Sequence, residues 1–147
     1  METDETIKKG FLRLERYAQN IPGGFHCCAE DPENGYPFAY VSDRFLEILG
    51  WEREEFAARF DNRYTALIHP DDLAAGLRYR NAENSATYAK NGDSIFRLLG
   101  KNGYRWVTNA ANQVEWYGKG YIVGTITDIT PYMELREKLE QQNRTQR

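Results

Sequence analysis

The sequence predicts an α+β fold organised around an antiparallel sheet. Three hydrophobic segments, expected as strands over residues 94–99, 104–116 and 121–126, follow one another with Gly-rich turns between them. Strands joined by such short turns pair antiparallel, so we expect a meander. The first turn closes with Asn102 and Gly103, a pair that supplies the positive φ angles of a tight hairpin. After the third strand the sequence becomes helical, so the sheet leads directly into a helix.

Two further strands are expected nearer the N-terminus, over residues 25–29 and 38–41. The polar loop between them contains Pro32 and Gly35, which favour a turn and interrupt regular structure. The sheet should therefore have five strands.

Short helices are expected between the second and third strands. Ser42 is a suitable N-cap for the first, and Gly50 ends it. A second begins after Trp51. A third and longer helix should begin at Pro70 and reach about Tyr88, with two acidic residues in a first turn that favours negative charge.

The chain divides into an N-terminal flanking helix (residues 1–20), a central domain (residues 21–130) and an exit helix (residues 131–147). Spacings of four and three place the apolar residues of the N-terminal helix on one stripe, which we expect to mediate a homodimer or to cover the sheet: Ile7, Phe11, Leu14 and Ala18. The exit helix has no terminating cap in the sequence. We expect it to continue into a downstream effector domain of the same protein.

Composition and charge exclude several classes of partner. A chain of 147 residues fits one domain, and its net charge of −3 comes from charges scattered along the sequence. Without a basic stripe, nucleic-acid binding is not expected. No apolar run approaches the roughly 20 residues of a membrane span, and no signal peptide is recognisable, so we expect a cytoplasmic location.

No catalytic or metal-binding constellation is expected. Cys27 and Cys28 are neighbours on a strand and should point to opposite faces, which disfavours a disulfide between them. Together with His26 and His69 they do not have the spacing of a structural zinc site. His69 precedes Pro70 at a helix start, where capping is its expected role. The chain is not predicted to be an enzyme.

Five motifs in this order resemble the PAS domains of bacterial sensory proteins, in particular the PAS_3-like subtype with its C-terminal PAC segment. They are YVSDRFLEILGW at 40–51, EEF at 54–56, IHPDD at 68–72, GKNGYRWV at 100–107 and GTITDIT at 124–130. The resemblance covers roughly residues 21–130. It implies a five-stranded antiparallel sheet with short helices on one face and flanking helices at both ends.

The resemblance also implies a cavity that holds a small molecule or cofactor between sheet and helices. Its mostly apolar lining, with one amide, would be Phe45, Leu49, Leu73, Leu77, Phe96, Leu98, Val107, Asn109, Ile122 and Ile126. Asp128 and Thr130 would relay the signal to the exit helix, and the effector would be a histidine kinase or a diguanylate cyclase. As a structural alternative, the pocket residues fill a core and the two relay residues only cap the exit helix.

The identity of the cofactor is not predicted, but two cofactors are disfavoured. Haem-binding members carry a histidine on the long helix, and residues 73–92 contain none. Photoactive flavin-binding members need a cysteine in an Asn-Cys-Arg-Phe segment, where this sequence has FDNRYT at 60–65.

Two functions therefore remain from the sequence. The first is a sensor that binds a small molecule and changes the position of the exit helix. The second is a ligand-free module for dimerisation or for binding another protein through the N-terminal stripe.

Overall fold

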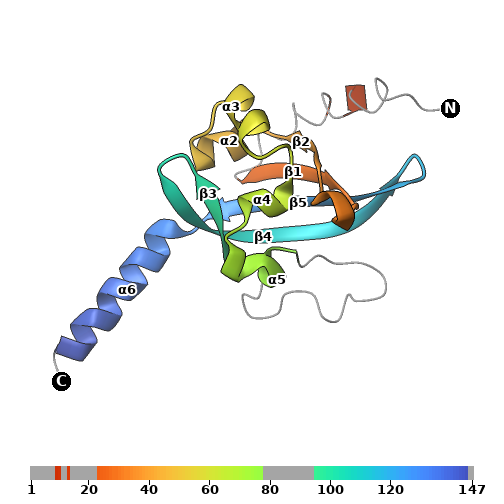
Figure 1. Cartoon of the computed structure of the whole chain (residues 1–147). Helices are drawn as coiled ribbons and strands as arrows, with labels where there is room; N and C mark the ends of the chain where they lie inside the picture. The colour runs from red at the N-terminus through yellow and green to blue at the C-terminus, as the bar shows by residue number, and fades with distance from the viewer. Residues whose placement is uncertain (1–8, 11–12, 14–22, 78–94, 146–147) are drawn as a thin grey trace.

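The computed structural model describes residues 9–10, 13, 23–77 and 95–145 of the chain. Five strands in these ranges form one sheet: β1 (Gly24–Ala29), β2 (Phe38–Val41), β3 (Ile95–Gly100), β4 (Gly103–Trp116) and β5 (Lys119–Asp128). Their order is β2-β1-β5-β4-β3, and each neighbouring pair is antiparallel (Figure 1). The predicted α+β class and five-stranded sheet are confirmed.

Short helices lie between β2 and β3 in the sequence and cover the inner face of the sheet (Figure 1). They are α2 (Asp43–Leu49), α3 (Arg53–Arg59), α4 (Tyr64–Leu67), the 3₁₀ turn η2 (Pro70–Asp72) and α5 (Leu73–Gly76), while a further 3₁₀ turn, η1 (Pro32–Asn34), lies between β1 and β2. The sequence predicted α2 and α3 but not α4. The chain becomes helical at Pro70 as predicted, but as a 3₁₀ turn followed by the short helix α5, which ends at Gly76. The rest of the helix expected to about Tyr88 lies, from residue 78 on, outside the described residues.

Side chains hold the starts of these helices as the sequence indicated. Ser42 Oγ accepts hydrogen bonds from the backbone N–H of Phe45 (3.2 Å) and of Phe25 (3.0 Å), which fastens α2 to β1. Gly50 ends α2 with φ 83°. His69 Nδ1 accepts from the backbone N–H of Asp71 at 3.1 Å, so the predicted capping role of this histidine is confirmed.

The two hairpins of the meander differ from the expected turn chemistry. Gly103 has φ 124°, but Asn102 is not among the residues with positive φ. Gly100 pairs directly with Gly103. Neither residue of the loop between them has a positive φ, and only the following glycine is left-handed. The turn with two positive φ angles joins β4 to β5, at Tyr117 (51°) and Gly118 (75°).

The outer face of the sheet carries a second, smaller apolar cluster. Cys27 and Tyr121 are buried there, while Cys28 points to the inner face, as strand alternation predicted. Gly10 lies against this cluster, since a Cβ at Gly10 would approach Trp116 Cη2 to 2.6 Å. The stripe predicted on the same N-terminal segment lies outside the described residues: Ile7, Phe11, Leu14 and Ala18.

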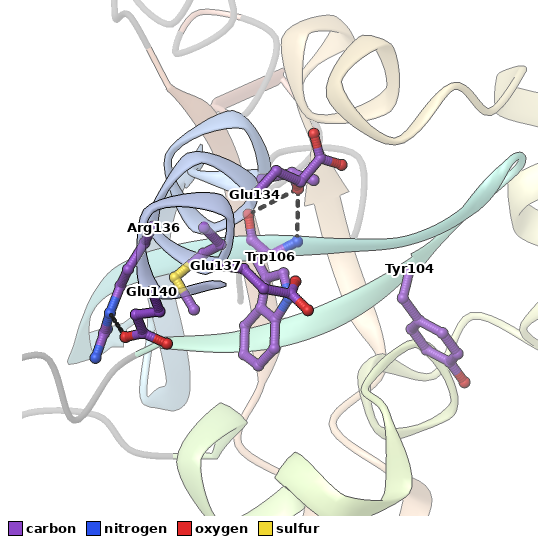
Figure 2. A pocket seen from close by; sticks show the side chains of 8 residues that line it. Tyr104, Trp106, Glu134, Arg136, Glu137 and Glu140 are labelled. Atoms are coloured by element: carbon purple, nitrogen blue, oxygen red, sulfur yellow. Dashed lines mark hydrogen bonds and ion pairs between the residues drawn. The ribbon is translucent and has the colours of Figure 1, made fainter. Parts of the chain in front are cut away.

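The exit helix α6 (Thr130–Thr145) projects away from the sheet (Figure 1). Its first turns border a groove of about 500 Å³ beside Tyr104 and Trp106 of β4, and Figure 2 shows that Glu134, Glu137 and Arg136 come from the helix side. The apolar side chains farther along the helix are exposed: Tyr132, Leu135 and Leu139.

Candidate functional site

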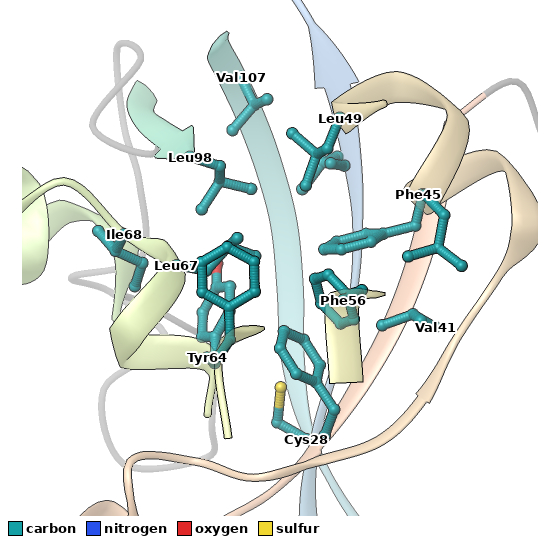
Figure 3. Close-up of a cluster of buried hydrophobic side chains, with 14 of the residues drawn as sticks. Cys28, Val41, Phe45, Leu49, Phe56, Tyr64, Leu67, Ile68, Leu98 and Val107 are labelled. Atoms are coloured by element: carbon teal, nitrogen blue, oxygen red, sulfur yellow. The ribbon is translucent and has the colours of Figure 1, made fainter. Parts of the chain in front are cut away.

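A cluster of apolar side chains fills the space between the inner face of the sheet and the short helices (Figure 3). Phe45 and Leu49 enter it from α2, Phe56 from α3, and Leu98 and Val107 from the strands. Five aromatic rings in this cluster pack edge to face or tilted at centroid distances of 5.4–6.0 Å, a favourable arrangement for aromatic pairs: Phe38, Phe45, Phe56, Phe60 and Tyr64.

Most residues predicted to line the pocket lie in this interior. Eight are buried: Phe45, Leu49, Phe96, Leu98, Val107, Asn109, Ile122 and Ile126. Leu77 is partly buried against the cluster. Leu73 is 38 % exposed, so its predicted place in the lining is wrong. The 3₁₀ turn η2 precedes it, and because this turn has three residues per turn, Leu73 emerges on the solvent side.

A buried hydrogen bond between two polar side chains crosses the inner face of the sheet. His26 of β1 donates from Nε2 to Oδ1 of Asn109 of β4 at 3.0 Å. Gly124 of β5 lies between the two strands, and a Cβ there would come within 2.9 Å of both bonded atoms. The missing side chain of Gly124 therefore makes room for the bond. Sequence reasoning identified Asn109 but missed His26 and Gly124.

The ring of His26 contacts two aromatic rings. It stacks on Tyr64 with centroids 5.3 Å apart and lies 5.6 Å from Phe45. Burial lowers the pKa of His26 to about 4, although the bond to Asn109 acts in the opposite direction. The imidazole is thus neutral at physiological pH. Its proton is on Nε2, which leaves the lone pair of Nδ1 as an acceptor.

The cavity beside this ring is small. It has a volume of about 10 Å³, and the residues around it include His26, Tyr64, Asn109, Ile122 and Leu77. Such a volume holds about one water molecule. A larger molecule can enter only if part of the wall moves.

The same strand that carries Asn109 also holds the start of the exit helix. The backbone N–H of Trp106 donates to Thr130 Oγ1 at 2.8 Å (Figure 2). The N–H of Ile129 donates to the Trp106 carbonyl at 2.8 Å. Thr130 was expected as an N-cap, but its hydroxyl instead ties α6 to β4. The cap is supplied by Asp128, whose Oδ1 accepts from the Thr130 N–H at 2.9 Å.

Asp128 is also paired with Arg105 of β4, at 2.7 Å between Oδ2 and Nη2. Partial burial opposes ionisation of this carboxyl, but the hydrogen bonds from Thr130 and Arg105 outweigh it, and the pKa of Asp128 is lowered. The carboxylate therefore stays charged where strand becomes helix.

A second ion pair supports Trp106 from the neighbouring strand. The guanidinium of Arg97 in β3 forms two hydrogen bonds with the carboxylate of Asp72, of 2.8 and 3.0 Å, and lies 4.8 Å from the centre of the Trp106 ring. The side-chain bond from Arg97 lowers the pKa of Asp72. The sequence indicated a structural role for Asp72 but not this partner.

A family model described as the PAS fold matches residues 38–126, more than half of the chain. The chain belongs to the PAS family. No curated protein has a sequence that matches it closely enough to count as a relative. The matched range holds β2, β3, β4, most of β5 and the helices α2 to α5. It includes Asn109 and Gly124, whereas His26 on β1 lies before it.

Solved structures show the same PAS fold. A sensory box histidine kinase/response regulator from Burkholderia thailandensis is 23 % identical, with 90 % of this chain and 96 % of that chain covered and a TM-score of 0.57. A PAS domain from a two-component sensor histidine kinase is 14 % identical, with 82 % and 97 % covered and a TM-score of 0.56. An RNA-binding light-oxygen-voltage receptor is 18 % identical, with 88 % and 36 % covered and a TM-score of 0.58.

The described residues of this PAS domain also bear on metal binding, membrane spanning and thiol chemistry. Across these residues, no three His, Cys, Asp or Glu side chains are grouped to hold a metal ion. No helix within the same ranges is long and apolar enough to cross a membrane. Burial raises the pKa of Cys27 to about 12 and also raises that of Cys28, so neither thiol is a ready nucleophile.

Proposed function

We propose that this chain is the sensory PAS module of a bacterial signal-transduction protein. A small molecule binds in the interior between the sheet and the short helices. The structural change that binding causes is passed through Asp128 and Thr130 to α6. From α6 it reaches a cytoplasmic effector domain of the same protein, of the histidine kinase or diguanylate cyclase type. The similarity to PAS domains of histidine kinases supports the first of these effectors.

The observation that carries this proposal is the position of β4. Asn109 faces the cavity. Three residues earlier, the backbone of Trp106 holds the start of α6 by donating to the Thr130 hydroxyl and accepting from the Ile129 N–H. A ligand that moves Asn109 must therefore move or strain the attachment of α6. The ligand must bind the two arrangements with different affinity, and a tenfold preference corresponds to about 1.4 kcal/mol.

Native mass spectrometry of gently purified protein tests the binding step. We expect a noncovalent adduct that disappears in Ile122→Phe, a substitution that fills the cavity from β5. Val114→Phe, on an exposed position of β4, is the matched control and should keep the adduct. Hydrogen exchange of α6 should differ between the adduct and the stripped protein. A bare mass in wild type and an α6 that exchanges identically in every preparation would contradict the proposal.

A second candidate is a ligand-free homodimer or protein-interaction module. The close contact of Gly10 with Trp116 favours it, because it places Gly10 against the outer face of the sheet. This face has an apolar hollow of about 470 Å³, with Phe25, Tyr121 and Val123 in its lining. The predicted apolar stripe of Ile7, Phe11, Leu14 and Ala18 would pack in this hollow or against a second copy of the chain.

Sedimentation velocity tests this candidate. Phe11→Asp should convert a dimer to a monomer, whereas Lys9→Asp, on the neighbouring part of the same segment, should not. An unchanged mass for Phe11→Asp would rule out the stripe as the interface.

A further inference from the structure

Two buried polar atoms beside the small cavity have no hydrogen-bond partner within the described part of the chain: Nδ1 of His26 and the hydroxyl of Tyr64. Their residues are 0 % and 4 % exposed. Native structures rarely leave such groups unsatisfied, and a bound water or ligand is a common explanation when they do. Both residues line the same cavity.

The chemical character of the two groups is complementary. Nε2 of His26 donates to Asn109, so Nδ1 accepts. Burial raises the pKa of Tyr64 well above its ordinary value, so its hydroxyl keeps the proton and donates. The cavity therefore presents one acceptor and one donor.

The site is uncharged, and its histidine ring has several contacts. The His26 ring packs against Tyr64 and Phe45 and bonds to Asn109. None of the described residues that line the cavity is Asp, Glu, Lys or Arg. A charged group placed there would lose its hydration without gaining a counter-ion, so the site selects against ions.

We propose that His26 and Tyr64 form the polar end of the ligand site and bind one neutral hydroxyl group. This deepens the proposed sensor function and rests on it. A hydroxyl donates its proton to Nδ1 and accepts from Tyr64, which satisfies both groups at once. The cavity volume of about 10 Å³ fits that single group. The rest of a ligand would occupy space that opens when the apolar wall near Leu77 moves aside.

Nitrogen-15 NMR of the histidine rings tests this directly in the intact protein. At neutral pH we expect His26 to be the neutral Nε2–H tautomer with Nδ1 in a hydrogen bond. Phenol and toluene then serve as probes of nearly equal shape. Phenol should shift the Nδ1 signal saturably and bind about tenfold or more tightly than toluene, because only phenol carries the hydroxyl.

Tyr64→Phe should reduce the preference for phenol to less than about threefold while the Nε2–H tautomer stays. Tyr104→Phe, an exposed tyrosine away from the cavity, should keep the wild-type preference. The tautomer measurement needs no substitution, so the proposal remains testable if Tyr64→Phe does not fold.

Several results would overturn the proposal. The first is a proton on Nδ1 of His26. The second is an Nδ1 that forms no hydrogen bond, whether phenol is present or absent. The third is toluene that binds as tightly as phenol. If Nδ1 is hydrogen-bonded but its signal never responds to phenol, its partner is a resident water. That result would also overturn the proposal that the site binds the hydroxyl of a ligand. None of these results depends on a co-purified ligand or on α6, so failure here is distinguishable from failure of the sensor function.

Discussion

His26 is the residue on which the polar part of the interior depends, because it makes three separate contacts from a short strand. It bonds Asn109 across β5, stacks on Tyr64 and packs beside Phe45. An unpaired buried polar group costs about 1–3 kcal/mol, so the contacts that satisfy Nε2 matter for stability as well as for binding.

The low pKa of His26 predicts a pH-dependent stability. The folded pKa of about 4 lies below the ordinary 6.5, so the unfolded state binds more protons between these values and stability falls as pH falls. Between pH 7.5 and pH 5 the free energy of unfolding should decrease by about 2 kcal/mol. His26→Gln should remove most of this decrease, as measured by denaturant unfolding at both pH values.

Val114→Ala, on an exposed position of β4 that does not titrate, is the control and should keep the wild-type pH dependence. Carboxyl groups with a lowered pKa, such as those of Asp72 and Asp128, change stability only below this pH range, because the ordinary pKa of an aspartate is 3.8. An equally steep pH dependence in His26→Gln would show that His26 is not the group that titrates.

Gly124 is predicted to be needed for the His26–Asn109 bond. In Gly124→Ala the added Cβ would meet both bonded atoms at 2.9 Å and the Ala110 carbonyl oxygen at 3.0 Å, so the bond must open. We expect a loss of about 1–3 kcal/mol in the free energy of unfolding. Thr127→Ala, exposed on the same strand, should change it by less than about 0.5 kcal/mol. Equal effects of the two substitutions would contradict this role.

At the scale of elements, the connection between β3, β4 and η2 depends on Arg97. Its guanidinium binds the Asp72 carboxylate through two nitrogens and lies over Trp106, and a lysine cannot do both. Arg97→Lys should therefore destabilise the protein by about 1–2 kcal/mol. Arg136→Lys replaces the arginine of an exposed pair with Glu140 and should have almost no effect in the same unfolding experiment. A neutral Arg97→Lys would show that the pair contributes little.

Elements with strong local signals were predictable, and those that depend on distant contacts were not. Ser42 and Gly50 could be predicted as the two ends of α2, because each acts locally on the backbone of that helix. Tyr64 could not be placed, since α4 is one turn long and the sequence around it has no apolar period. Strand alternation places His26 on the same face as Cys28, but no local pattern reveals that its hydrogen-bond partner is Asn109 on a distant strand.

At the scale of the whole molecule, the motif order and strand periodicity were enough to predict the PAS fold and most of the apolar interior. The polar constellation was only half predicted, through Asn109. Its other members come from β1 and α4, and only the folded sheet brings them together.

The central claim is that the interior and the exit helix are coupled through β4. The start of α6 has two reporter amides, Ile129, which donates to Trp106, and Met133, which makes the first turn of the helix with Ile129. Both should open more easily when the interior bond of Asn109 is removed, whereas the amide of Leu139 in the middle of α6 should not respond.

Hydrogen exchange of these amides in Asn109→Leu and wild type measures this coupling most directly. The account predicts about tenfold faster exchange at Ile129 and Met133, equivalent to about 1.4 kcal/mol, with Leu139 unchanged. Unchanged protection of Ile129 and Met133, in a variant that has lost the His26–Asn109 bond, would contradict it.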